Sequence, residues 1–162
     1  MKNVHFRSDK NSWETPHWLF AILDGLYKFT LDPCATNGNK KCDRYYDLHQ
    51  DGLSKDWEHE RVFINPPYGR DIGKWVKKAH DLKNGVAVLL LPSRTDTRWW
   101  HDYVMNANKV WLIKGRITFE GGKSSAPFPS AIVIFDRDGS MYYEVADQFV
   151  TFNREVFTGI NT

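Results

Sequence analysis

The sequence is poor in cysteine and in long apolar runs, and each shortage excludes a class of protein. It has only two cysteines, Cys34 and Cys42, which argues against a disulfide framework. Their spacing is not C-x-x-C, so we expect no zinc site and no other metal. No apolar run approaches the length of a membrane span, and residues 1–10 are too polar for a signal peptide. These features favour a protein of the reducing cytoplasm.

An excess of charge of one sign is also missing, because 22 basic residues oppose 20 acidic ones, for a net charge of +2. This balance excludes a histone-like wrapper of DNA but permits a local basic face. The length of 162 residues corresponds to one domain, so we expect a flexible tail over residues 1–12 and a single domain over residues 13–162. Aromatic residues, in contrast, make up 15% of the chain, enough for both a core and stacking on a ligand.

Helical and strand patterns alternate along most of the chain. Helices are predicted over residues 15–27, 71–82 and 96–107, the first with Thr15 as N-cap. Strands are predicted over residues 29–32, 61–65, 86–91, 109–113, 117–120 and 131–135. The pattern favours a compact α/β domain with a mostly parallel sheet, helices on both faces, and the last two strands as an antiparallel closing pair. Ligands of such sheets bind beyond the carboxyl ends of the strands.

The most informative strand end carries Asn65, Pro66, Pro67 and Tyr68. The prolines form a stiff turn without N–H donors, so the Asn65 side-chain oxygen and the Pro66 carbonyl are free to accept hydrogen bonds. Two such acceptors can hold the exocyclic amine of a base and direct its lone pair at an electrophile. The Tyr68 ring can stack on the same base. The four residues also suit a simple turn after a strand.

This motif resembles the catalytic motif of S-adenosylmethionine-dependent amino-methyltransferases, and the wider pattern resembles the bacteriophage-type DNA N6-adenine methyltransferases. The resemblance spans about residues 12–136 and includes, in order, Trp13-x-Thr15-Pro16, Leu31-Asp32-Pro33-Cys34-Ala35, Asp51-Gly52-Leu53, Asp56-Trp57, Asn65-Pro66-Pro67-Tyr68, Leu91-Pro92-Ser93-Arg94-Thr95 and Gly115-Arg116-Ile117-Thr118-Phe119.

The resemblance implies a class I Rossmann-like methyltransferase domain that transfers a methyl group from S-adenosylmethionine to the N6 amine of a flipped adenine in DNA. The implied catalytic residues are Asn65, Pro66, Pro67 and Tyr68. The implied cofactor-binding residues are Trp13, Thr15, Pro16, Asp32, Pro33, Cys34, Asp51 and Asn65, with Asp47 as an alternative to Asp51. A phage or prophage enzyme of this kind works in the cytoplasm of its bacterial host.

Two features depart from the family pattern. The loop after Asp32 has a single glycine, Gly38, so its turns depend on Asn37, Gly38 and Asn39. Only 33 positions separate Asp32 from Asn65, so the intervening strand and helix units are shortened or lost. The residues that contact the ribose and adenine of the cofactor stay open.

Basic residues near or after strand ends are candidates for contacts with DNA phosphates: Arg70, Lys74, Arg94, Arg98, Arg116 and Lys123. Two alternatives to DNA methylation remain at this point. The same chemistry could act on an RNA base or on a protein glutamine amide, and a catalytically silent module could bind cofactor or nucleic acid. The sequence leaves the oligomeric state open.

Overall fold

The computed structural model describes residues 12–139 and 148–152. Their helices are α1 (His17–Tyr27), η2 (Gly52–Ser54), α2 (Ile72–His80), α3 (Arg98–Asp102) and η3 (Val104–Asn106). Their strands are β1 (Arg61–Ile64), β2 (Val86–Pro92), β3 (Lys109–Ile113), β4 (Ser130–Asp136) and β5 (Phe149–Phe152). The predicted flexible tail, apart from Ser12, lies outside the described residues.

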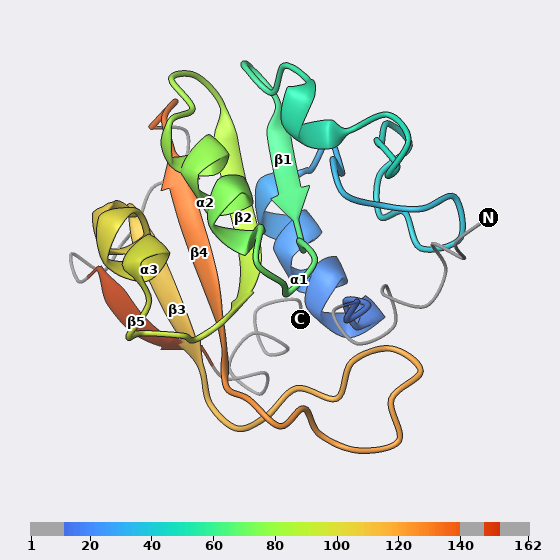
Figure 1. Cartoon of the computed structure of the whole chain (residues 1–162), viewed down its shortest axis with the longest axis vertical. Coiled ribbons are helices and arrows are strands. Elements are labelled where there is room, and N and C mark those ends of the chain that lie inside the picture. Colours follow the sequence, from blue (N-terminus) through green and yellow to red (C-terminus); the bar gives the residue numbers. More distant parts are fainter. Residues whose placement is uncertain (1–11, 140–147, 153–162) are drawn as a thin grey trace.

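The five strands form one mixed sheet in the order β1-β2-β4-β3-β5 (Figure 1). β1 is parallel to β2, and β3 is parallel to β5. β4 lies inside the sheet and is antiparallel to both of its neighbours, β2 and β3. β1, β2 and β3 therefore run in the same direction, and their carboxyl ends lie at one edge of the sheet. The long loop of residues 114–129 extends from this edge (Figure 1).

Helices cover both faces of the sheet, as predicted. In Figure 1, α1 lies behind the sheet, and α2 and α3 lie in front of it. α1 buries Leu19, Leu23 and Tyr27, which are four residues apart and therefore share one helical face. Every residue of β2 and β4 is buried, so these two strands form the centre of the core. Each fully buried aliphatic side chain there contributes roughly 1.5–3 kcal/mol to stability.

The strand predicted over residues 29–32 is reduced to single bridges. Leu31 pairs with Val62, and Asp32 pairs with Tyr45, both in parallel. The N–H groups of Thr30 and Leu31 both donate to the Arg61 carbonyl, and Pro33 has no N–H, so a longer ladder does not form. These bridges still place Asp32 beside β1, at the edge where β1 ends.

Two predicted elements are wrong. Residues 117–120 form no strand, because their backbone groups bond within their own loop and to the segment before α1: the Ala126 N–H donates to the Ile117 carbonyl, and the Glu120 N–H donates to the Glu14 carbonyl. The antiparallel partners of β4 are thus β2 and β3. The helix predicted over residues 96–107 is two short pieces, α3 and η3, with Thr97 capping the first.

The N-cap of α1 is also not the predicted one. The helix starts after Pro16, and Thr15 makes no capping hydrogen bond. Within the described residues, no helix combines the length and the apolar character that a membrane span requires.

Candidate active site

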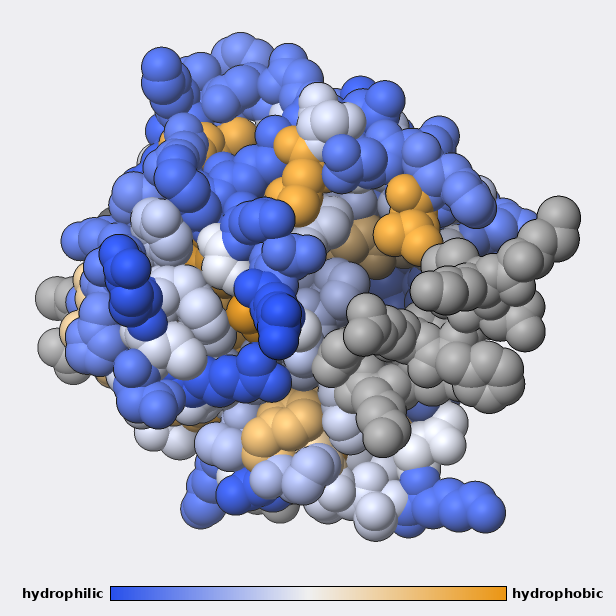
Figure 2. Space-filling view, in the orientation of Figure 1, coloured by the Kyte–Doolittle hydropathy of each residue, from blue (hydrophilic) through white to orange (hydrophobic). Residues whose placement is uncertain are grey.

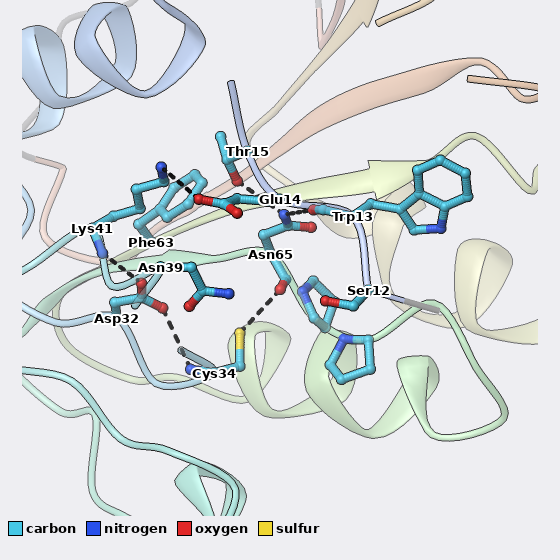
Figure 3. A pocket seen from close by; sticks show the side chains of 12 residues that line it. Ser12, Trp13, Glu14, Thr15, Asp32, Cys34, Asn39, Lys41, Phe63 and Asn65 are labelled. Atoms are coloured by element: carbon cyan, nitrogen blue, oxygen red, sulfur yellow. Dashed lines mark hydrogen bonds and ion pairs between the residues drawn. The ribbon is translucent and has the colours of Figure 1, made fainter. Parts of the chain in front are cut away.

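A small, open pocket lies at the carboxyl end of β1 (Figure 3). Three segments build it: residues 12–15 before α1, the loop that follows Asp32, and the turn after β1. Its lining residues are Ser12, Trp13, Glu14, Thr15, Asp32, Cys34, Asn39, Lys41, Phe63, Asn65, Pro66 and Pro67. The sheet thus brings together residues that are up to 55 positions apart, from Ser12 to Pro67.

Asn65 uses the two ends of its side-chain amide differently. Its Nδ2 donates to the Trp13 carbonyl and, at 2.9 Å, to Oγ1 of Thr15, which is 2% exposed. Its Oδ1 is buried and has no hydrogen-bond partner among the described residues. A buried acceptor without a partner costs roughly 1–3 kcal/mol, and native structures contain few of them. The amide is therefore fixed by its donor end, with its acceptor end available to a ligand.

Cys34 fixes the backbone of the same residue. Its Sγ donates to the Asn65 carbonyl at 3.2 Å. Burial raises the pKa of this thiol well above its usual value, and the neighbouring Asp32 charge adds to that effect. The thiol therefore stays protonated and acts as a hydrogen-bond donor at neutral pH.

Asp32 is 4% exposed and lines the same pocket. Its carboxylate accepts the Lys41 N–H at 3.0 Å and the Cys34 N–H at 3.4 Å. Burial raises its pKa to about 6, although these two backbone hydrogen bonds act in the opposite direction. A cation next to this carboxylate would stabilise the ionised form.

The loop after Asp32 is held by its own side chains, and of the three residues predicted to make its turns Asn39 does so, together with Thr36. The Thr36 N–H donates to the Asn39 side chain at 2.7 Å, and the Asn39 N–H donates to Thr36 Oγ1 at 3.2 Å. These reciprocal bonds replace the turns that additional glycines would make.

A second pocket of about 300 Å³ adjoins the first, with Ser12, Cys34, Asn39 and Pro67 lining both. Its other lining residues are Pro33, Ala35, Thr36, Asp47, Leu48, Asp51, Gly52 and Trp75. Asp47 accepts the N–H groups of His49 and Gln50 at 2.9 and 3.0 Å, whereas Asp51 is exposed with a left-handed φ of 49°. Both candidate acids thus lie at this pocket. Pro16 is the only predicted cofactor residue that lines neither pocket.

Sequence reasoning missed Lys41 and Glu14, which also line the first pocket. Lys41 Nζ lies 4.0 Å from a Glu14 carboxylate oxygen, and the Lys41 side chain is only 8% exposed. Nothing in the local sequence distinguishes Lys41 from its neighbour Lys40, so only the fold separates the two.

Tyr68 is 3% exposed and does not present a free face. Its hydroxyl donates to the Leu90 carbonyl at 3.2 Å, and burial raises the pKa of this phenol far above its usual value. Its ring packs edge-on against Phe119 and Phe128, with centroids 6.3 and 5.6 Å away. Trp13 contacts the same two phenylalanines. We call Trp13, Tyr68, Phe119 and Phe128 the aromatic cluster.

The candidate phosphate contacts follow the carboxyl ends of β1, β2 and β3, and therefore lie at the same edge as the pocket: Arg70, Arg94, Arg98, Arg116 and Lys123. All are exposed except Arg94, which is half-buried, and none has a carboxylate of a described residue within ion-pair distance. Lys74 differs, because it pairs with Asp71 at 2.8 Å. Hydrophilic residues dominate the face of the molecule shown in Figure 2, and the hydrophobic areas on that face are small and separate.

The described residues contain no cluster of three or more His, Cys, Asp or Glu side chains that could hold a metal ion. Asp32, Glu14, Lys41 and the Asn65 amide together suit a ligand that carries both positive and negative groups.

Comparison with known proteins identifies the family. The family description "DNA N-6-adenine-methyltransferase (Dam)" matches residues 3–155. The chain belongs to this family. It is 29% identical over 140 residues to the DNA N-6-adenine-methyltransferase of Haemophilus phage HP1, covering 80% of this chain and 81% of that protein. It is 34% identical over 114 residues to the enzyme of the same name from Escherichia phage T1, covering 67% of this chain and 47% of that protein.

A crystal structure from Listeria monocytogenes, assigned to the class I S-adenosylmethionine-dependent methyltransferases, shares the fold. Its TM-score is 0.55 at 12% identity, covering 86% of this chain and 65% of that one. Family and fold together confirm the predicted family, the class I methyltransferase fold, the enzyme class and S-adenosylmethionine as cofactor. The roles of individual residues are a separate question.

Proposed function

We propose that this Dam-family enzyme methylates the N6 amine of adenine in DNA and that Asn65 Oδ1 accepts a hydrogen bond from that amine. The buried, unpartnered state of this oxygen is the observation that supports the role most strongly. Because the Trp13 carbonyl can only accept, the amide cannot turn over without losing the hydrogen bond from Nδ2 to that carbonyl. The acceptor is thus oriented before the substrate arrives, which favours electrostatic stabilisation of the transition state.

The cofactor supplies an electrophilic methyl group. The protein positions the acceptor nitrogen and stabilises the positive charge that develops on it. In this proposal Asn65 Oδ1 and the Pro66 carbonyl hold the two N–H groups of the amine, and Pro67 keeps the turn rigid and free of competing donors. No general base is needed for bond formation, because the nitrogen can lose its proton afterwards.

The charged and polar groups around Asp32 fit S-adenosylmethionine, and the two adjoining pockets provide room for it. In our assignment Trp13, Thr15, Asp32 and Cys34 lie at the methionyl end, since they line the pocket that contains Asn65. Pro33 and Asp51 lie at the nucleoside end, in the second, more apolar pocket. Pro16 contributes only by starting α1 where the residues before it reach Asn65.

The target adenine must leave the DNA duplex, at a cost of a few kcal/mol. Phe119 and Phe128 pack against the Tyr68 ring in this structure. Tyr68 can therefore stack on the base only if these two side chains move away from its ring. Both phenylalanines belong to the loop of residues 114–129. We therefore propose that this loop moves on DNA binding and that the base replaces the phenylalanine contacts of Tyr68.

The DNA backbone follows the edge that carries Arg70, Arg94, Arg98, Arg116 and Lys123 in this proposal. Lys74 is left out because Asp71 already neutralises it. We further propose that residues 13–162 act as one catalytic domain in the cytoplasm of a bacterial host, encoded by a phage or prophage like the two phage relatives.

A methyl-transfer assay with labelled S-adenosylmethionine tests the proposal against its alternatives. Duplex DNA, RNA of the same sequence and a glutamine-containing peptide serve as parallel substrates. We expect label in DNA only, and nucleoside analysis should identify the product as N6-methyladenine. Label in RNA or peptide alone, methylcytosine as the product, or cofactor binding without transfer would refute it.

A further inference from the structure

Lys41 has an unusual environment for a lysine in a polar loop. Its side chain is 8% exposed, and its ammonium lies at the pocket shared with Asp32 and Asn65 (Figure 3). Lysine side chains are rarely this buried unless they are paired. The nearest carboxylate, that of Glu14, is 4.0 Å away, which is beyond hydrogen-bond distance. Lys41 Nζ makes no hydrogen bond to any side chain or carbonyl in the part of the chain that the structure describes.

A backbone hydrogen bond, in addition to side-chain packing, determines where this ammonium lies. The Lys41 N–H donates to Asp32 Oδ2 at 3.0 Å, so the backbone at Lys41 is tied to another residue that lines the pocket. The adjacent Lys40 is exposed and lies over the Tyr45 ring, 4.8 Å from its centroid. Two neighbouring lysines thus have opposite environments, and only one lines the pocket.

We infer that Lys41 binds the carboxylate of the methionyl group of S-adenosylmethionine. This inference rests on the proposed function only in that the cofactor binds in this pocket. An ammonium at a pocket wall that has an ion pair at 4.0 Å but no hydrogen-bond acceptor can bind an anionic ligand, and charge-assisted hydrogen bonds to carboxylates are the strong kind. No residue of the family motifs supplies such a cation to this pocket, where the other charged side chains, Glu14 and Asp32, are acids and the Cys34 thiol is neutral.

The charges of the pocket and the ligand match. Glu14, Asp32 and Lys41 together carry one net negative charge when all are ionised. S-adenosylmethionine carries a sulfonium, an ammonium and a carboxylate, so its net charge is one positive. Lys41 faces the only anionic group of that ligand, and the acids face its cationic groups. Lys41 therefore makes the pocket select ligands with an intact amino-acid end.

The test compares two ligands that differ only by the carboxylate, S-adenosylmethionine and decarboxylated S-adenosylmethionine, with Kd measured by calorimetry. The wild-type protein should prefer S-adenosylmethionine by about 10- to 100-fold. Lys41→Met should remove this preference by weakening S-adenosylmethionine binding alone, whereas Lys41→Arg should retain most of it. Lys40→Met is the matched control and should behave as wild type.

Other outcomes would overturn the inference. A wild-type protein that binds both ligands equally has no carboxylate site, and a folded Lys41→Met protein that keeps the preference excludes Lys41 from it. Equal loss of affinity for both ligands would mean that Lys41 only ties the loop to Glu14. If Lys41→Met melts below the assay temperature, Lys41→Gln undergoes the same comparison. Failure of the wild-type protein to bind either ligand would instead contradict the proposed function.

Discussion

Asn65 combines a structural role and a chemical one in a single amide. Its donor end bonds to Trp13 and Thr15, fifty or more positions earlier in the chain, and its acceptor end stays unpartnered. Functional groups need such support, because a side chain that is free to rotate loses the precision on which transition-state stabilisation depends. The segment before α1 is therefore part of the catalytic apparatus in our account, although it contributes no reacting atom.

Asp32 gives the site a predictable response to pH. Its pKa of about 6 means that it is largely protonated at pH 5 and ionised at pH 7.5. The cofactor's positive groups favour the ionised form, so binding lowers this pKa, and affinity must rise as pH rises through 6. We expect Kd for S-adenosylmethionine to fall roughly tenfold from pH 5 to pH 7.5, as measured by calorimetry.

The Asp32→Asn variant is the control for that measurement. It should bind more weakly at pH 7.5 and lose the pH dependence, because the residue no longer titrates. A wild-type affinity that does not change across this range, or an Asp32→Asn protein with the same pH profile, would remove Asp32 from the site.

At the scale of elements, the loop after Asp32 and the short helix η2 pack directly on each other. A Cβ at Gly52 would lie 1.8 Å from the Pro33 carbonyl oxygen, closer than any real contact allows. The second pocket is built from this contact, since Pro33 and Gly52 both line it. Glycine at position 52 is thus required by the close approach of two backbones.

We predict that Gly52→Ala lowers stability by about 1–3 kcal/mol and weakens cofactor binding, because the two loops must separate. Gly25→Ala is the matched control. Apart from its chain neighbours and the backbone of α1 itself, no atom lies within 4 Å of a Cβ at Gly25, and alanine favours helix over glycine by roughly 0.5–1 kcal/mol. Thermal melts and calorimetry measure both effects. A Gly52→Ala protein as stable as Gly25→Ala would contradict the packing argument.

The elements that could be predicted are those whose sequence pattern and burial agree. The apolar run before Pro92 and the strand before Asn65 lie where their patterns predict. In residues 117–120, hydrogen bonds within and between loops take the place of strand pairing. Ile117 and Phe119 have apolar spacing typical of a strand, but they are buried in the loop of residues 114–129, where the Ala126 N–H donates to the Ile117 carbonyl and the Glu120 N–H donates to the Glu14 carbonyl.

In the candidate site, too, some residues could be predicted from the sequence and others could not. Asn65 and Asp32 follow strand or bridge ends, and that position made them visible in the sequence. Lys41 and Glu14 carry no such signal, since a charged residue in a polar loop is usually solvated. Tyr68 was expected to offer its face to a base, but its present burial depends on Phe119 and Phe128, which are more than fifty positions away.

At the scale of the whole molecule, the directions of the strands bring the candidate functional residues to one edge of the sheet. Because β4 is antiparallel between β2 and β3, the ends of β1, β2 and β3 meet there. The proposed catalytic turn, the proposed cofactor pockets and the exposed cations follow these ends. A protein with a net charge of only +2 can therefore still present a locally basic edge to DNA.

This arrangement predicts a salt dependence for DNA binding. If five cations contact phosphates, the slope of log K against log salt should be about −4.5, since each contact contributes roughly −0.9. Arg98→Ala should reduce the slope by about 1. Lys83→Ala, between α2 and the amino end of β2, should leave it unchanged. Fluorescence anisotropy at several salt concentrations measures this. Equal effects of the two variants would argue against a basic edge.

The role of the Asn65 acceptor is tested most directly by the single-turnover rate of methyl transfer to DNA, with cofactor and enzyme saturating. We predict that Asn65→Ala lowers this rate by about 100- to 1000-fold while Kd for cofactor and DNA changes little. Thr15→Val, which removes a partner of Nδ2 but keeps Oδ1, should lose far less. A stably folded Asn65→Ala protein that methylates adenine at the wild-type rate would contradict the account.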